Sequence, residues 1–327
     1  MKLLITTPTA LLMASLSSEF ELEDVSVLEH GNGVYFGITM TERAFYVLVR
    51  YHSALRTETS HGRHAIVSYD RSFTPTGYVA LPPYVIAEGH QMVRRDGVFH
   101  ITNTYYNTLT LVGDDGIIRE DFRPNPQYAG MNFNHLNTVF MSQDKMVLGF
   151  ANRFRSSFQM EFAYPSRDFL GVNATGFGTH NYVETPEFTA VCDSQHGAII
   201  AWPGIRDDQG AELPMYRYTL LPDTNEVDCT CISLRRYGYY LANPVTRFFT
   251  RGLAIDKSGT MVSGIEILAA RSERGSTPTR IVVIPEFKSG FEGIKLRPVY
   301  HLLGDYGDVH DIRIVDRFDF GHPVVGD

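Results

Sequence analysis

A repeated segment is the feature of this chain that most constrains its fold. In each copy a polar or aromatic residue begins an alternating apolar strand, and a Gly-containing or polar turn leads into a second strand. The copies begin at Phe36, His90, His135, Thr189, Arg251 and His310. Their mean spacing is about 55 residues, slightly longer than the repeat of well-known propeller blades. Short β-rich runs with frequent turns are typical of sandwiches, barrels and propellers, and this repeat favours the propeller.

One copy shows the whole unit. The segment Gly89 to Pro124 contains four short strand patterns, and Asp-Gly pairs at Asp96-Gly97 and Asp115-Gly116 separate the first from the second and the third from the fourth. Asp-Gly is a strong signal for a tight hairpin turn. Four antiparallel strands joined by tight turns make one propeller blade.

The two ends of the chain complete each other. Residues His310 to Val315 look like an innermost strand, whereas Leu3 to Thr7, Ala10 to Ser15 and Phe20 to Leu28 look like three outer strands without an inner one. One blade built from both termini removes the free sheet edges. The sequence therefore predicts an all-β, six-bladed propeller as a single domain over residues 1–327. Five blades with an irregular closing region are the alternative.

Charge and motif content narrow the functional classes. The net charge is -8, from 29 Lys and Arg against 37 Asp and Glu, which argues against a nucleic-acid partner. No apolar run is long enough for a membrane span. Neither a G-x-G-x-x-G fingerprint nor a Walker loop occurs, so no nucleotide cofactor is predicted. Three cysteines without a framework spacing favour a cytoplasmic location, the alternative being secretion if residues 1–18 are a signal peptide.

Propeller geometry also predicts where a site should be. The start of the first strand and the end of the second strand of every blade lie at the same mouth of the ring, and a pocket for a small-molecule ligand can form there. The strand starts supply the candidate catalytic residues His90, His135, His310 and Arg251. The strand ends, together with a neighbour of His135, supply the candidate substrate-binding residues Arg50, Asn103, Asn152, Trp202, Glu266 and Asn137.

Three interpretations of these residues stay open. In the first, His90, His135, His310 and Glu266 hold one divalent metal ion that activates water or a carbonyl group. In the second, one histidine is a metal-free general base, and Arg251 holds an anionic group or stabilises an oxyanion. Both predict a hydrolase, lyase or isomerase acting on a small polar, anionic metabolite. In the third, the protein is a non-catalytic binding scaffold, and the histidines only form hydrogen bonds within the channel.

One long segment fits the repeat poorly. Residues Arg155 to Thr185 are rich in Phe, Tyr, Gly and Asn and show little periodicity. We expect an extended loop between blades here, lying over the mouth as a lid or as a partner surface.

The repeat resembles a known superfamily. The blade GHQMVRRDGVFHITNTYYNTLTLVGDDG, the segment NHLNTV and the closing VHDIRIVD resemble six-bladed propellers of the SMP-30/gluconolactonase-like, strictosidine-synthase-like and NHL-repeat groups, and most nearly a bacterial propeller family of uncharacterised function. The resemblance covers nearly the whole chain. For the lactonases it implies an oxygen-rich metal site of Glu, Asn and Asp at one mouth. Asn103, Asn152 and Glu266 are compatible with that set by position, whereas a matching Asp is not evident and the histidines and Arg251 depart from it.

Overall fold

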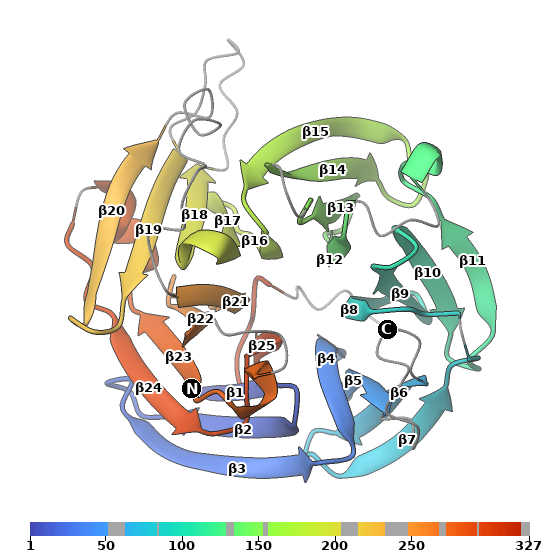
Figure 1. The fold of residues 1–327 in the computed structure, drawn as a ribbon, viewed down its shortest axis with the longest axis horizontal. Coiled ribbons are helices and arrows are strands. Elements are labelled where there is room, and N and C mark those ends of the chain that lie inside the picture. The colour runs from blue at the N-terminus through green and yellow to red at the C-terminus, as the bar shows by residue number, and fades with distance from the viewer. Residues whose placement is uncertain are drawn as a thin grey trace.

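The strands form six sheets arranged as blades around a central channel (Figure 1). The structure is a computed structural model. It describes residues 1–51, 63–83, 85–128, 134–152, 156–203, 215–232, 248–267, 273–292 and 294–321. The prediction of a six-bladed β-propeller is confirmed, and the five-bladed alternative is wrong.

The blades are named A to F here, and their strands are given from the channel outward. Blade A is β25 (Asp311–Ile314), β1 (Lys2–Thr6), β2 (Ala10–Leu16) and β3 (Leu22–His30); blade B is β4 (Gly33–Met40), β5 (Ala44–Tyr51), β6 (His64–Asp70) and β7 (Pro75–Ala80). Blade C is β8 (Gly89–Arg95), β9 (Val98–Asn103), β10 (Thr108–Gly113) and β11 (Ile118–Phe122); blade D is β12 (Leu136–Met141), β13 (Lys145–Phe150), β14 (Ser157–Ala163) and β15 (Phe169–Gly176). Blade E is β16 (His180–Glu184), β17 (Phe188–Asp193), β18 (Ala198–Pro203), β19 (Met215–Leu221) and β20 (Glu226–Ile232); blade F is β21 (Phe248–Ile255), β22 (Met261–Ile267), β23 (Thr279–Ile284) and β24 (Val299–Gly304). The short 3-10 helices are η1 (Pro126–Tyr128), η2 (Ser194–His196), η3 (Arg274–Ser276) and η4 (Phe287–Glu292).

Both ends of the chain build blade A, as the sequence predicts. The C-terminal strand β25 pairs antiparallel with β1, from Leu3 opposite Ile314 to Thr6 opposite Asp311. The strands β2 and β3 continue the sheet outward. This pairing joins residues about as far apart in sequence as the chain allows, so the ring is closed by backbone hydrogen bonds rather than by a linker.

Blade E differs from the sequence-based expectation. It has five strands, and its innermost strand is β16, whereas Thr189 lies in the second strand β17. The segment expected to be a loop over the mouth instead forms β14, β15 and β16, which are the outer half of blade D and the inner edge of blade E. Three apolar side chains of β15, Phe169, Leu170 and Val172, are more than half exposed, so the sequence lacks the alternation of buried apolar and exposed polar residues that would have marked this strand.

Polar side chains on the inner strands link neighbouring blades. The Val139 backbone N–H of blade D donates to Gln91 Oε1 of blade C at 3.3 Å, and Asn137 Nδ2 donates to the Thr179 carbonyl of the next blade at 3.0 Å. The pairing ladder is interrupted at both Gln91 and Asn137. Such bulges redirect side chains and leave backbone groups to be satisfied from elsewhere. The inner strands are therefore locked to one another around the channel.

The apolar core lies between the facing sheets. The interface of blades E and F shows the pattern: Ile199 and Tyr218 of blade E pack with Leu253, Ile265 and Val282 of blade F, and all five are fully buried. In the described part of the chain, no helix has the length and apolar character needed to cross a membrane.

A histidine buried within blade C should make stability depend on pH. His100 on β9 is 3% exposed, and burial lowers its pKa from 6.5 to about 4. The imidazole of His100 therefore binds a proton more readily in the unfolded chain than in the folded chain. The contribution of neutral His100 to the free energy of unfolding is fully present above pH 6.5 and is lost as the pH falls towards 4. The loss should reach about 3 kcal/mol. Urea unfolding at several pH values should show this slope in the wild type, and His100→Gln should flatten it; an unchanged slope in the variant would assign the effect to other groups.

Candidate active site

A cavity of about 550 Å³ lies at one mouth of the channel. Its lining comes from all six blades and includes Pro8, Val34, Phe36, Arg50, Glu88, His90, His135, Ala151, Gly178, His180, Gln195, Phe249, Arg251, Gly275, Asp308 and His310. The structure therefore brings together all four candidate catalytic residues and Arg50. His180 is a further member that the sequence analysis did not single out.

Aromatic rings form a continuous group within the cavity. His90 lies at its centre, with ring centroids 5.3 Å from His135 and 6.4 Å from His180. Phe36 separates His90 from His310: its ring is 5.7 Å from His90 and stacks on His310 at 4.9 Å with an interplanar angle of 3°. Three imidazoles are therefore near neighbours, and the fourth is held beside them through an aromatic ring.

Hydrogen bonds fix the orientation of three of these imidazoles. The Nδ1 atom of His90 lies 2.7 Å from the Glu88 carbonyl oxygen, that of His180 lies 2.8 Å from the Gly178 carbonyl, and that of His310 lies 2.7 Å from the Tyr35 carbonyl. A carbonyl oxygen can only accept, so each Nδ1 must carry the proton. In the neutral ring Nε2 is then the basic nitrogen. Backbone carbonyls thus impose the same tautomer at three positions: His90 and His180 use the carbonyl two residues earlier in the chain, and His310 uses that of Tyr35 in the neighbouring strand β4.

Positive charge beside His90 opposes its protonation. Burial is the main cause that lowers the pKa of His90 well below its usual value, and the Arg251 guanidinium, His135 and His180 add to it. Arg251 itself is 7% exposed. A second guanidinium, that of Arg50, lies 5.2 Å from the centre of the Phe36 ring. His90 is therefore held as a neutral base next to a buried cation.

Carboxyl groups also lie in and next to the cavity. Glu88 and Asp308 line it, whereas Glu266 is buried and is not part of the lining. Burial raises the pKa of Glu266 well above its usual value, and the nearby Asp308 carboxylate adds to the rise, whereas Arg251 opposes it. Neither Glu266 oxygen makes a hydrogen bond of ordinary geometry within the described residues. Burial therefore favours the neutral form of the Glu266 carboxyl group.

The predicted substrate-binding residues other than Arg50 are not in the cavity lining, namely Asn103, Asn137, Asn152, Trp202 and Glu266. Asn103 holds the turn before His90, because it accepts from the Ala87 N–H at 2.9 Å and donates to the Val85 carbonyl at 2.7 Å.

The other two asparagines also bind backbone. Asn137 contacts Thr179, next to His180, and Asn152 donates to the Ser156 carbonyl at 2.9 Å. The asparagines at these strand ends therefore position the lining segments rather than form the lining.

The extra strand of blade E explains why Trp202 lies outside the cavity and why the sequence analysis did not single out His180. Trp202 pairs with Thr189, which in turn pairs with Glu184 at the far end of β16 from His180. Trp202 therefore lies at the opposite end of the blade from the cavity. The signal for His180 is present in the sequence, since His180-Asn-Tyr-Val repeats the pattern His90-Gln-Met-Val.

The predicted metal ligands do not form a cluster in the described structure. Within the described residues, no group of three or more His, Cys, Asp or Glu side chains is arranged as a metal site. Phe36 separates His310 from His90, and Glu266 is not among the residues that line the cavity. The described residues thus do not assemble the set His90, His135, His310 and Glu266 around one point.

Comparison with known proteins supports the fold. The sequence matches no protein family and no curated protein. Among solved structures, a complex of nidogen and laminin is similar with a TM-score of 0.56, 8% identity and coverage of 95% of this chain and 97% of the other. A protein of unknown function from Bacteroides caccae has a TM-score of 0.52 and 13% identity, covering 95% and 98%. The Pseudomonas aeruginosa periplasmic gluconolactonase has a TM-score of 0.52 and 10% identity, also covering 95% and 98%. The chain thus shares its propeller architecture with lactonase-like and other propellers.

Proposed function

We propose that the protein is a hydrolase that opens a small polar ester or lactone at the mouth of the channel and releases a carboxylate. The observation that carries the proposal is the meeting of backbone-fixed imidazoles with a buried guanidinium in one cavity. A neutral imidazole is a general base, and a guanidinium stabilises an oxyanion. The lactonase activity of one propeller of the same architecture agrees with this chemistry.

The reaction can be written with the residues of this chain. Nε2 of His90 removes a proton from water while the water oxygen bonds to the substrate carbonyl carbon. The negative charge that develops on the carbonyl oxygen is stabilised by Arg251. When the carbonyl re-forms, the bond to the ring or alcohol oxygen breaks, and the imidazolium returns its proton to that oxygen. The carboxylic acid product loses its remaining proton to bulk water, and the resulting carboxylate has Arg251 and Arg50 as cationic partners within the cavity.

The proposal is tested by turnover. Purified protein is incubated with a panel of sugar-acid lactones and small esters, with and without added divalent metal, and acid release is followed in a pH-stat. We expect at least one lactone or ester to be opened faster than in buffer. Binding of the panel without any turnover would instead favour the non-catalytic scaffold.

Arg251 should set the pH range of activity. Because its charge helps to lower the pKa of His90, the acid limb of kcat/KM should lie below pH 6.5, the usual histidine value. Arg251→Gln should move this limb to higher pH, in addition to lowering the rate. The exposed Arg297 supplies the control, and Arg297→Gln should leave the profile unchanged. An acid limb that stays in place in Arg251→Gln would contradict the assigned pairing.

A further inference from the structure

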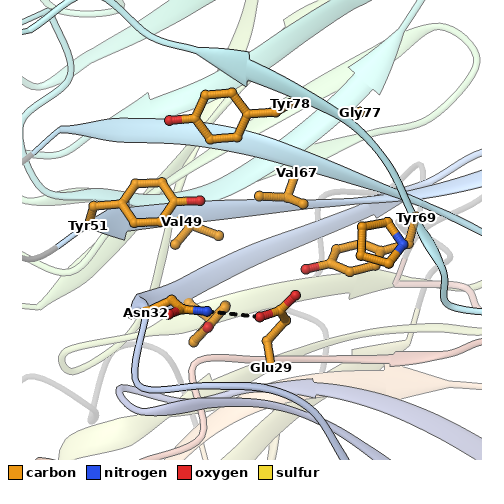
Figure 2. Close-up of a pocket in the computed structure, with 10 residues that line it drawn as sticks. Glu29, Asn32, Val49, Tyr51, Val67, Tyr69, Gly77 and Tyr78 are labelled. Atoms are coloured by element: carbon orange, nitrogen blue, oxygen red, sulfur yellow. Dashed lines mark hydrogen bonds between the residues drawn. The ribbon is translucent and has the colours of Figure 1, made fainter.

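A second cavity, of about 440 Å³, lies between blade A and blade B (Figure 2). Its lining contains four tyrosines and one carboxylate, namely Tyr35, Tyr51, Tyr69, Tyr78 and Glu29. The remaining lining residues are Asn32, Val49, Val67, Pro75 and Gly77. None of these ten residues lines the candidate active site. The cavity is therefore separate from the proposed hydrolase site, and an inference about it does not depend on that function.

Strand alternation produces this concentration of tyrosines. Val49 and Tyr51 are two apart on β5, so they share one face of the sheet, and Val67 and Tyr69 do the same on β6. Tyr35 on β4 pairs with Val49, and Tyr78 on β7 pairs with Val67. Directly paired residues lie on the same face. One face of blade B thus presents an aromatic surface across all four of its strands.

The rings form walls at an angle to each other. The centroids of Tyr51 and Tyr78 are 6.1 Å apart, and their planes meet at 49°. Figure 2 shows these two rings on one side of the cavity and the Glu29 carboxyl on the other. Tyr78 is 58% exposed, so the cavity is reached from solvent past this ring. Tyrosine faces carry negative electrostatic potential and attract cations placed within about 6 Å of the ring centre.

Glu29 supplies the only acidic group of the lining. Its Oε2 accepts from Asn32 Nδ2 at 3.1 Å, and no Lys or Arg of the described residues forms an ion pair with it. Burial is the main cause that raises the pKa of Tyr35 to about 12, and the negative charge of Glu29 adds to the rise. Burial likewise raises the pKa of Tyr51, with smaller contributions from Tyr78 and Glu29. The hydroxyls are therefore neutral, and the cavity has a net negative character.

We propose that this cavity binds a small quaternary ammonium group. Aromatic faces at an angle, closed by one carboxylate, are the arrangement that recognises trimethylammonium cations. The group can come from a free metabolite such as choline or from a trimethylated lysine side chain of another protein.

The test uses tetramethylammonium as the first probe. Ligand-observed NMR of the full-length protein should show upfield shifts of the methyl protons, because protons over an aromatic face are shielded. Choline and a peptide carrying trimethyllysine are titrated next, and the tighter of the two identifies the source. The neutral isostere 3,3-dimethylbutan-1-ol has the same shape without charge. If tetramethylammonium, choline and the peptide all fail to bind, or if the neutral isostere binds as tightly as choline, the proposal is wrong.

Matched variants separate charge from ring contributions. Glu29→Gln should weaken choline binding about tenfold, whereas Glu23→Gln, at an exposed position of the same strand, should change it less than about twofold. Tyr78→Ala should weaken binding about fivefold, and Tyr78→Phe, which keeps the ring face, should restore it. Equal affinities for all four variants would place the ligand elsewhere. Thermal melting of each variant checks that the blade is intact, and the exposed position of Tyr78 makes its replacements safe for folding.

Discussion

Asp311→Ala should lower the free energy of unfolding by about 3–5 kcal/mol. Asp311 is fully buried at the start of β25, where its carboxylate joins three blades. It accepts from the Ile38 N–H of blade B at 2.9 Å and from Asn181 Nδ2 of blade E at 3.1 Å, and it pairs with Arg313 at 3.1 Å. Alanine would leave the N–H group, the amide and a buried guanidinium without their shared acceptor.

Urea unfolding measures this loss, and a nearby carboxylate supplies the control. Asp316 lies in the same segment, is partly exposed and makes only long ion pairs of 3.7 Å. Asp316→Ala should therefore cost less than about 1 kcal/mol. Asp311→Asn keeps one acceptor oxygen and should fall between the two. A loss for Asp311→Ala no larger than that of Asp316→Ala would show that the ring is not held by this carboxylate.

His90→Gln should lower kcat/KM for the ester or lactone identified in the panel by about 10²–10⁴. Glutamine keeps a polar side chain of similar reach but has no basic nitrogen, so water loses its proton acceptor. The melting temperature should change little, because the bond from His90 to the Glu88 carbonyl contributes about as much as one ordinary hydrogen bond. Initial rates and thermal melting are measured on the same preparation.

Two comparisons make the His90 result specific. His30→Gln replaces an exposed histidine on β3 and should leave the rate unchanged. His180→Gln removes a neighbouring imidazole with the same imposed tautomer, so its effect shows whether a second histidine takes part in proton transfer. Wild-type rates in His90→Gln would remove His90 from the mechanism, and a large loss in His180→Gln alone would transfer the role of base to that residue.

Much of the architecture followed from local signals. Asp96-Gly97 and Asp115-Gly116 predict the hairpins of blade C, and the structure has strands ending and beginning at these turns. The unmatched strand patterns at the two termini predict the shared blade, because a strand with unpaired backbone groups needs a partner. The repeat also placed His90, Arg251 and His310 at one mouth, since equivalent positions of a ring converge on its axis.

What local signals did not determine was register. Choosing Thr189 instead of His180 as the start of blade E shifted that blade by one strand, which moved Trp202 into the predicted site and left His180 out of it. The register also differs at His135. In blade C, His90 comes directly before the bulged residue Gln91, whereas in blade D the residue directly before the bulged Asn137 is Leu136. His135 is one residue further back, just before β12, with a φ of 56°. It reaches the cavity from a left-handed turn rather than from the strand.

The sequence by itself therefore determined the strand content, the ring and the mouth at which polar side chains gather, because alternation and turn chemistry act over a few residues. Only the tertiary structure decided which side chains face the cavity and which hold its walls. Asn103 and Asn137 look like ligand-binding residues in the sequence, yet their amides are used by backbone groups of adjoining segments. The tyrosine cavity is also a tertiary feature, since β3 to β7 must pack before Glu29 can face rings that are up to 49 residues away in the chain. Contacts between segments that are distant in the chain determine both the role of these asparagines and the formation of the tyrosine cavity, and a local sequence pattern does not predict such contacts.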